Sequence, residues 1–345
     1  MNHEFWMQRC LELAGKAAGL TSPNPMVGCV IVHENKIIGE GYHFKAGLAH
    51  AEVIAIQQVK NQALLPYSTL YVSLEPCVHF GKTPPCTNLI IEKKIPKVVI
   101  GAIDTHSKVA GKGVEKLQQH GVEVTINILQ QECLALNKHF YEVHNHQKPY
   151  IYLKFAQSKF GKIGKLEGKS IALSNTFTNQ LTHNLRAQVD AILVGKNTFI
   201  NDHPQLTCRW ITGKIPIKIL FTKGENWDWI LPTAELNDWI IVSYSPAPSH
   251  LQLNNIVISS QNWKAELAQN LLNLNIQSVL IEGGKQILEH FINEEFYNEI
   301  WRINTPNELN TGIDAPKIPS HLKIQQSIQS HQDTIEILKK EEHIP

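Results

Sequence analysis

The residues His50-Ala51-Glu52, followed along the chain by Pro76-Cys77 and then by Cys86, are the most informative part of this 345-residue sequence. One imidazole and two thiolates are ligands that tetrahedral zinc prefers, and three protein ligands leave the fourth position for water. We expect His50 at the start of a helix, which places Glu52 in the same first turn. The Glu52 carboxylate would then lie beside the metal-bound water without being a ligand itself.

The order of these residues predicts a specific chemistry. Zinc lowers the pKa of a bound water toward neutrality, and a neighbouring carboxylate can carry the released proton. Attack of that water on a carbon that bears an exocyclic amine, with the proton delivered to the departing nitrogen, is hydrolytic deamination. H-x-E followed by P-C and a second Cys is typical of zinc nucleobase deaminases. The sequence therefore predicts one zinc ion per chain, held by His50, Cys77 and Cys86, with Glu52 as the catalytic residue.

The segment between the two cysteines is longer than in that general pattern. Residues 78–85 separate them, where two residues are usual. A glycine in this segment permits a turn and a pair of prolines stiffens the returning chain, so the second thiolate can still reach the metal. The loop would place His79 and Lys82 beside the site, where they suit a phosphate or carbonyl group of a small substrate.

Three other interpretations of the same residues explain less. A structural zinc site needs four protein ligands. His79 offers a fourth, but such a site gives no role to Glu52. A redox-active cysteine pair does not fit this spacing. A chance arrangement of one histidine and two cysteines does not account for the joint presence of the glutamate and the proline.

Length and composition predict a two-domain globular protein. Hydrophobic residues make up 43% of the chain and charged residues 18%, which suffices for ordinary packed cores. The net charge of +1 argues against a large contact surface for nucleic acid or an anionic membrane. There is no run of about 18 apolar residues and no secretion-signal pattern at the N-terminus. Mostly isolated cysteines fit a reducing compartment, so we expect a cytoplasmic protein.

The first part of the chain alternates helix and strand patterns. An apolar helical pattern at residues 5–18 precedes a hairpin at 29–39, and helices then alternate with strands up to a helix at 132–144. This order favours an α/β architecture with a mostly parallel sheet after the opening hairpin. A polar segment that ends in Pro149 follows.

That segment marks the expected domain boundary, because polar stretches with proline commonly link domains. We predict domains at residues 1–145 and 150–345, joined by a linker at 146–149. The second domain begins another alternating series, and the tail from about residue 318 is polar and charged. Its predicted strands are 150–156, 191–194, 217–221, 239–244 and 278–282.

Several motifs resemble those of the bifunctional riboflavin-biosynthesis deaminase/reductase family. They are Thr21-Ser22-Pro23-Asn24-Pro25-Met26-Val27-Gly28, Gly39-Glu40-Gly41-Tyr42-His43, Val109-Ala110-Gly111-Lys112-Gly113 and the segment from Ser73 to Cys86. The long cysteine loop is specific to that family rather than to deaminases in general. The resemblance covers nearly the whole chain. It implies an N-terminal cytidine-deaminase-like α/β/α layer domain and a C-terminal dihydrofolate-reductase-like α/β domain.

For the first domain, the resemblance implies roles for individual residues. His50, Cys77 and Cys86 would hold zinc and Glu52 would transfer the proton. The pyrimidine ribotide pocket would be lined by Asn24, His43, His79 and Lys82. Without the motif, Asn24 between two prolines is a turn residue and His43 is a surface histidine at a strand end.

For the second domain, the resemblance implies hydride transfer from NADPH, which converts a ribosyl group to ribityl. Its implied substrate contacts are Ser170, Arg186, Leu206, Arg209 and Glu282, with the arginines suited to the substrate phosphate. Its implied cofactor contacts are Lys154, Ala156, Ala172, Thr198, Asp202, Thr222 and Gly284. Judged from the residues alone, two interpretations fit Gly283-Gly284, which lies between a strand and a helix. Either the backbone N–H groups at the helix start bind a phosphate, or the two glycines only form a tight turn.

The implied function is deamination of 2,5-diamino-6-(5-phosphoribosylamino)pyrimidin-4(3H)-one, then reduction of 5-amino-6-(5-phosphoribosylamino)uracil. The expected partner is this small pyrimidine ribotide, with no nucleic acid and no membrane, and a homo-oligomer is left open. A nucleic-acid base deaminase would need a basic, aromatic-lined channel, which the charge balance does not support. Phe160 and Ala172, where the family usually has Asp and Trp, motivate another alternative, in which the C-terminal domain only binds the ribotide.

Overall fold

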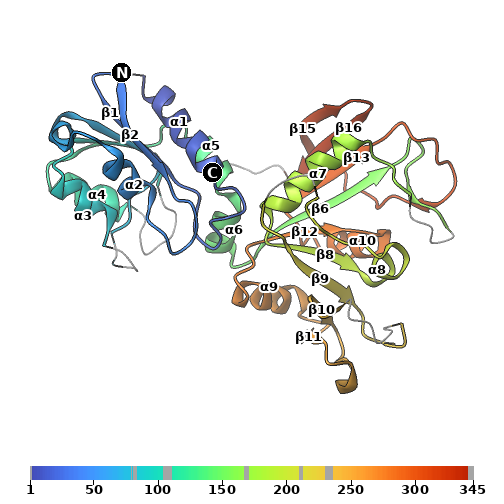
Figure 1. The fold of residues 1–345 in the computed structure, drawn as a ribbon. Helices are drawn as coiled ribbons and strands as arrows, with labels where there is room; N and C mark the ends of the chain where they lie inside the picture. Colours follow the sequence, from blue (N-terminus) through green and yellow to red (C-terminus); the bar gives the residue numbers. More distant parts are fainter. Residues whose placement is uncertain are drawn as a thin grey trace. The chain divides into compact units, whose positions relative to one another are not determined.

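The computed structural model divides the chain into two compact units, residues 1–147 and 148–345. Both units are α/β (Figure 1). The residues that the structure describes are 2–78, 80, 84–103, 111–166, 171–209, 213–229 and 236–340. Among these residues, none of the helices combines the length and the apolar character needed to cross a bilayer.

The first unit contains a five-stranded sheet of order β2-β1-β3-β4-β5. Strand β1 pairs antiparallel with β2 and β3, whereas β3, β4 and β5 are parallel. The elements in chain order are α1 (His3–Gly15), β1 (Gly28–His33), β2 (Lys36–Tyr42), α2 (Ala51–Gln58), the 3-10 helix η1 (Gln62–Tyr67), β3 (Thr69–Leu74), α3 (Cys86–Glu92), β4 (Lys97–Ala102), α4 (Lys112–Gln119), β5 (Glu123–Thr125), α5 (Gln130–Leu136) and α6 (Lys138–His146).

Helices cover both faces of this sheet because its central strands are apolar on both sides. Cys29 and Ile31 of β1 belong to a buried cluster with residues of α2, α3 and α4. Val30 and Val32, which point the opposite way, pack with residues of α1 and α5. The predicted α/β/α layer arrangement is therefore confirmed.

The second unit contains a nine-stranded sheet of order β11-β10-β9-β8-β12-β6-β13-β16-β15. The strands from β11 to β13 are parallel, and β16 and β15 add an antiparallel hairpin at one edge. The elements are β6 (Tyr150–Gln157), β7 (Lys162–Gly164), α7 (Thr176–Gln188), β8 (Ala191–Gly195), α8 (Lys196–Asp202), β9 (Ile217–Thr222), β10 (Trp239–Ser243), the 3-10 helix η3 (Ser249–Leu251), β11 (Asn254–Val257), α9 (Trp263–Asn273), β12 (Ser278–Glu282), α10 (Lys285–Asn293), β13 (Glu299–Asn304), β14 (Ile313–Asp314), β15 (Lys323–Ser330) and β16 (Asp333–Lys339).

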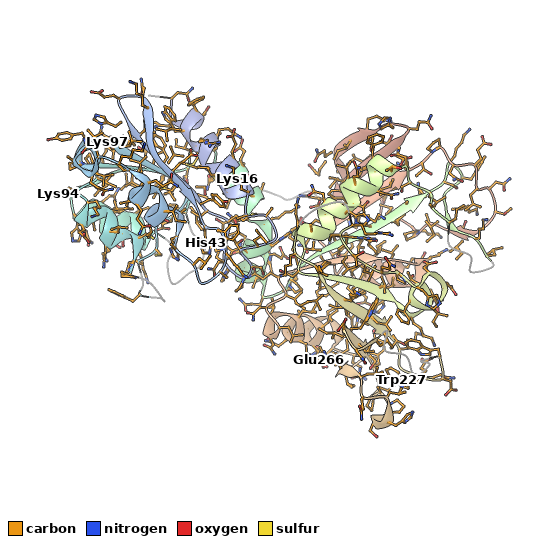
Figure 2. All side chains as sticks on the ribbon, viewed as in Figure 1. Lys16, His43, Lys94, Lys97, Trp227 and Glu266 are labelled. Atoms are coloured by element: carbon orange, nitrogen blue, oxygen red, sulfur yellow. The ribbon has the colours of Figure 1, made fainter. Side chains whose placement is uncertain are left out.

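Each face of this sheet also carries helices. Helices α9 and α10 pack on one face in a cluster that includes Leu153 and Ile281. Helix α7 packs on the other face, where Leu185 meets Tyr152 and Leu280. Side chains fill the space between sheet and helices in both units (Figure 2). Strands buried on both faces are typical of parallel sheets in α/β proteins.

Several predicted elements differ in extent. The first helix ends at Gly15 rather than at residue 18, and the strand predicted at 122–128 is the short β5. The helix predicted at 132–144 is two helices, α5 and α6, which separate at Asn137. The side chain of Asn137 pairs with the backbone of Met26, at 2.7 and 2.9 Å. The polar tail contains the hairpin of β15 and β16.

Candidate functional site

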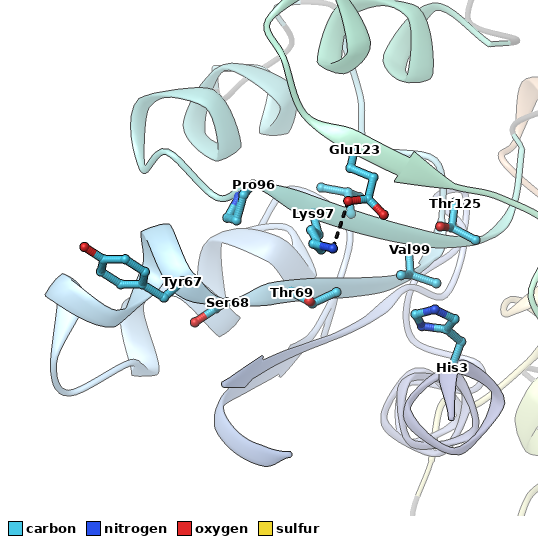
Figure 3. A pocket seen from close by; sticks show the side chains of 10 residues that line it. His3, Tyr67, Ser68, Thr69, Pro96, Lys97, Val99, Glu123 and Thr125 are labelled. Carbon is cyan, nitrogen blue, oxygen red and sulfur yellow. Dashed lines mark ion pairs between the residues drawn. The ribbon is translucent and has the colours of Figure 1, made fainter. Parts of the chain in front are cut away.

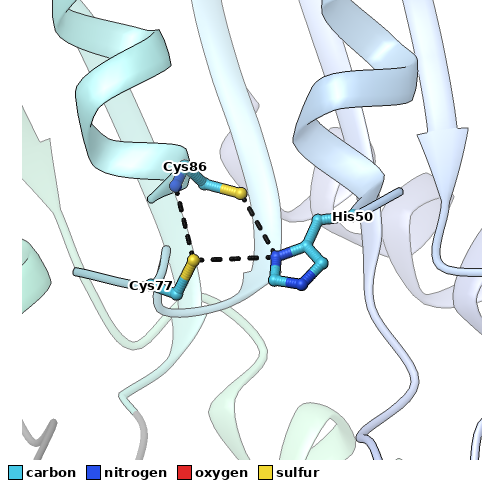
Figure 4. Close-up of side chains that lie close together, drawn as sticks. All are labelled: His50, Cys77 and Cys86. Carbon is cyan, nitrogen blue, oxygen red and sulfur yellow. Dashed lines mark hydrogen bonds between the residues drawn. The ribbon is translucent and has the colours of Figure 1, made fainter. Parts of the chain in front are cut away.

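Three chain segments of the first unit bring the predicted metal ligands together (Figure 4). His50 precedes the first turn of α2 with extended backbone, as the sequence predicted. Cys77 follows the carboxyl end of β3, and Cys86 is the first residue of α3. Both thiols therefore lie close to a helix N-terminus, whose positive end stabilises thiolates.

The distances among the three side chains fit a zinc ion. The His50 Nδ1 atom lies 3.6 Å from Cys77 Sγ and 3.3 Å from Cys86 Sγ. All three donor atoms lie within 4.8 Å of one another. Nitrogen and sulfur ligands of tetrahedral zinc are about 3.5 Å apart, given Zn–N and Zn–S bonds of about 2.0 and 2.3 Å. The donor set and its spacing therefore match a zinc site with three protein ligands.

The Cys77 sulfur has the electrostatic environment of a thiolate. It accepts a hydrogen bond from the backbone N–H of Cys86 at 3.3 Å. Hydrogen bonds with the Cys86 thiol and with His50 hold the pKa of Cys77 well below its usual range. A thiolate is the form in which cysteine binds metals.

Glu52 lies in the first turn of α2 and is 3% exposed. Burial raises the pKa of Glu52 to about 7, and the charge of Cys77 adds to this effect. A general acid–base works best when its pKa is near the working pH. Glu52 therefore has the position and the proton affinity of a proton carrier.

Asn24 and His43 lie beside the predicted metal ligand His50. His43 is buried, and burial lowers its pKa, so that the ring is neutral. Its Nδ1 lies 3.1 Å from the carbonyl oxygen of Ala49, which can only accept, so Nδ1 carries the proton. Its Nε2 then accepts from Asn24 Nδ2 at 3.1 Å. The His43 and His50 rings meet edge to face at 5.6 Å, so the interpretation of His43 as a surface histidine is wrong.

Three predicted substrate residues lie outside the described residues: His79, Lys82 and Ser170.

Cys77 is also held by a residue that the sequence analysis did not single out. Its carbonyl oxygen accepts hydrogen bonds from the backbone N–H and the hydroxyl of Thr87, at 3.3 and 3.1 Å. Thr87 immediately follows Cys86, and this adjacency to a ligand is the signal that could have found it.

In the second unit, an ion-pair cluster joins three predicted residues from different elements. Arg186 of α7 donates two hydrogen bonds of 2.7 Å to the carboxylate of Glu282, at the end of β12. Lys154 of β6 places its Nζ 4.0 Å from the same carboxylate. Burial alone would raise the pKa of Glu282, but Lys154 and Arg186 outweigh it and lower that pKa to about 2. Glu282 is therefore ionised throughout the physiological range.

Predicted cofactor residues lie at the carboxyl ends of the parallel strands. Ala156 is near the end of β6, Thr222 ends β9, and Gly284 follows β12. Thr198, in the first turn of α8, accepts a hydrogen bond from the Gly284 N–H at 2.8 Å. Open α/β sheets bind ligands at this edge. Besides Lys154, two predicted cofactor residues remain: Asp202 ends α8 and Ala172 precedes α7, and both are exposed.

His183 is a residue of this region that sequence reasoning missed. It lies one helical turn before Arg186, it is buried, and its Nδ1 accepts the backbone N–H of Arg209 at 3.1 Å. Arg209 itself is exposed, and Leu206 is buried in the cluster beneath the same loop. The spacing of His183 and Arg186 on one helix face could have identified it.

The first unit also contains a pocket that lies apart from the predicted metal ligands (Figure 3). It is lined at the amino-terminal ends of β3, β4 and β5, whereas Cys77 follows the carboxyl end of β3. Lys97 and Glu123 form an ion pair of 2.8 Å across it, and His3 lines another side. None of the predicted site residues that the structure describes lines this pocket.

Two protein families match the two parts of the chain. Residues 1–102 match the cytidine and deoxycytidylate deaminase zinc-binding region. Residues 149–326 match the RibD C-terminal domain. The first match contains His50, Glu52, Cys77 and Cys86, and the second begins at the division between the two units.

Relatives match the chain over nearly its full length. The riboflavin biosynthesis protein RibD of Aquifex aeolicus is 35% identical, and the alignment covers 97% of this chain and 93% of the relative. Among solved structures, Acinetobacter baumannii RibD has a TM-score of 0.87 at 30% identity, with 98% of both chains covered. A Thermotoga maritima diaminohydroxyphosphoribosylaminopyrimidine deaminase/5-amino-6-(5-phosphoribosylamino)uracil reductase has a TM-score of 0.87 at 32% identity, again with 98% of both chains covered. The chain belongs to the RibD family of bifunctional deaminase/reductases in riboflavin biosynthesis, with both catalytic domains present.

Proposed function

We propose that His50, Cys77 and Cys86 hold the zinc ion of the deaminase and that Glu52 is its proton carrier. The observation that carries this proposal is the convergence of one imidazole nitrogen and two sulfurs within 4.8 Å beside a buried carboxyl group. When bound, zinc supplies a water whose pKa is lowered toward neutrality. A structural site with a fourth protein ligand would leave this carboxyl group unexplained.

Glu52 takes up a proton at its carboxylate and delivers it to the amine nitrogen that leaves the pyrimidine ring. The pKa of Glu52, about 7, allows both steps near neutral pH. The product is 5-amino-6-(5-phosphoribosylamino)uracil, and the departing group is ammonia. Asn24 and His43 line the pyrimidine side of this pocket, where their mutual hydrogen bond fixes the orientation of both side chains. His79 and Lys82 complete the ribotide contacts.

In the reductase domain, Arg186, Arg209 and Glu282 bind the substrate, together with Ser170 and Leu206. Arg186 is oriented by Glu282 and by the carbonyl oxygen of Thr207, at 3.3 Å. Its guanidinium has five N–H donors, so donors remain for the substrate. Arg209 is exposed and provides the second cation for the phosphate.

NADPH, when bound, supplies the hydride that reduces the anomeric carbon of the ribose. Its contacts are Ala156, Ala172, Thr198, Asp202, Thr222 and Gly284, most of which lie near the carboxyl ends of parallel strands. Lys154 holds the ribose or the cofactor through its Nζ. Lys154 is suited to this role because Glu282 lies 4.0 Å from that atom and keeps the ammonium in place.

The test uses the purified full-length protein. After removal of metal, addition of zinc should restore ammonia release from 2,5-diamino-6-(5-phosphoribosylamino)pyrimidin-4(3H)-one. Addition of NADPH should then cause loss of the absorbance of the reduced nicotinamide. A zinc-loaded protein that releases no ammonia would refute the proposed deaminase site. The reductase is tested separately by supplying the aminouracil ribotide directly as its substrate.

We also propose a cytoplasmic location. The six cysteines are all free, as expected in a reducing compartment. Cell fractionation tests this location, and recovery of the protein outside the cytoplasmic fraction would refute the proposal.

A further inference from the structure

Glu75 is two residues before Cys77 in the sequence. Its carboxylate lies at the start of α4. Glu75 is 6% exposed. Its Oε1 accepts hydrogen bonds from the backbone N–H groups of Gly113 at 2.7 Å and Val114 at 3.2 Å, and its Oε2 accepts from Gly111 at 3.1 Å. Three N–H groups on one buried carboxylate, at the positive end of a helix, form a strong and directional anchor.

Two glycines make this anchor sterically possible. Gly111 has a φ of +74°, which glycine adopts without strain. A Cβ atom on Gly113 would lie 2.5 Å from the carbonyl oxygen of Pro76 and 2.9 Å from Glu75 Oε1. The first turn of α4 therefore packs directly against the peptide that precedes Cys77. This contact accounts for Gly111-Lys112-Gly113, a motif to which the proposed reaction assigns no role.

Cys77 is thus fixed from both sides. On its carbonyl side, Thr87 of α3 donates two hydrogen bonds to the Cys77 oxygen. On its amino side, the backbone N–H of Glu75 donates to Ala102 at the end of β4, at 3.0 Å, while the Glu75 carboxylate holds α4. The direction of the Cys77 sulfur depends on both attachments, because only Pro76 separates it from Glu75.

We propose that Glu75 is a positioning residue of the metal site, which sets the direction of Cys77 Sγ toward His50 and Cys86. The inference rests on the proposed metal ligands. Replacement by glutamine keeps the size of the side chain but places an amide NH₂ where one oxygen accepted a backbone N–H. At least one of the three hydrogen bonds is lost, and two donors face each other.

The experiment compares Glu75→Gln with Glu115→Gln in the full-length protein. Glu115 lies on the same helix, is exposed and contacts Gln119, so it is a matched control. Metal-stripped protein is titrated with Co²⁺, and the cobalt d–d and thiolate charge-transfer absorption is recorded. Zinc affinity follows from competition with a chelator. We expect an altered cobalt spectrum and roughly 10–100-fold weaker zinc binding for Glu75→Gln alone.

Far-UV circular dichroism checks that each variant is folded, and reductase activity on the aminouracil ribotide checks the other unit of the same chain. Gly113→Ala should give the same spectral change with the carboxylate intact, because its methyl group displaces the Pro76 carbonyl. It also serves as the test if Glu75→Gln cannot be purified.

The outcomes separate the two claims. If the wild-type protein shows no thiolate-to-cobalt band, the proposed ligand set is wrong and the inference falls with it. If the wild type shows the band and the variants lose only thermal stability, with the wild-type spectrum and affinity, Glu75 is a helix cap and the inference is overturned. Altered spectra and weaker binding in both variants support it.

Discussion

Replacement of Arg186 by methionine should destabilise the second unit by about 3 kcal/mol at pH 7. The Arg186 and Glu282 side chains are 14% and 11% exposed and share two hydrogen bonds of 2.7 Å. Removal of one member of a buried ion pair leaves the other charge uncompensated, which typically costs about 3–5 kcal/mol. Lys154, at 4.0 Å, compensates only part of the Glu282 charge.

The pKa of Glu282 gives the pH dependence of this effect. Lys154 and Arg186 together outweigh burial and lower the pKa from 4.5 to about 2 in the folded protein. This difference corresponds to about 3 kcal/mol of stability that the two cations supply jointly, since one pKa unit is worth about 1.4 kcal/mol. A carboxyl group with a depressed folded pKa stabilises the fold above pH 4.5, and this contribution is lost as the pH falls toward 2. The deficit of the variant should therefore shrink by about 1 kcal/mol or more at pH 3.5.

The assay is urea unfolding followed by tryptophan fluorescence. Trp6 is the only one of the seven tryptophans in the first unit, so the signal reports mainly on the second. Glu282→Gln and the double variant complete a mutant cycle, in which we expect a coupling energy of about 2 kcal/mol. A deficit that is equal at pH 7 and pH 3.5, together with additive single variants, would show that the pair does not have the assigned electrostatic role.

Three further predictions concern the two proposed sites. Glu52→Gln should keep its zinc, measured by metal analysis, but release ammonia about 10²–10⁴-fold more slowly, because the proton carrier is lost; a metal-free variant would contradict its assignment as a non-ligand. Cys77→Ser should lose both zinc and deamination while it still oxidises NADPH with the aminouracil ribotide, since a hydroxyl replaces a thiolate poorly; retention of zinc would exclude Cys77 as a ligand. Thr198→Val removes the acceptor of the Gly284 N–H and should raise the KM for NADPH about tenfold in steady-state kinetics, the effect of losing roughly 1.4 kcal/mol; an unchanged KM would place the cofactor elsewhere.

The first unit could be predicted closely because its signals are local. The apolar run of β1, the alternation in β2, and a turn at Glu34-Asn35 where both residues have positive φ, define the hairpin. The break between α5 and α6 was missed because it depends on Asn137 and Met26, which pair across a large sequence separation. Helical periodicity carries no information on such a contact.

The second unit was predicted less completely because several of its strands carry polar residues. Strand β13 contains Glu299 and Arg302, which makes it read as a surface segment, yet it lies inside the sheet. Glu299 accepts a hydrogen bond from Tyr150 at 2.7 Å, and Arg302 is paired with Glu336 at 2.7 Å. Buried polar groups require such partners, and the partners come from distant parts of the chain.

The two proposed sites differ in the same way: one has a local sequence signal, and the other depends on contacts between distant parts of the chain. The metal ligands could be found from sequence because zinc chemistry restricts the residue types and their order. Arg186 and Glu282 are each ordinary charged residues in sequence, and the pair exists only because α7 packs over the sheet where β12 ends. In both units some residues of the proposed sites follow the carboxyl ends of parallel strands, since Cys77 follows β3 as Gly284 follows β12. The pattern of strands and helices therefore locates the edge of the sheet at which a site lies. The residues of that site can be identified from the sequence only where few residue types can serve, as they do at zinc.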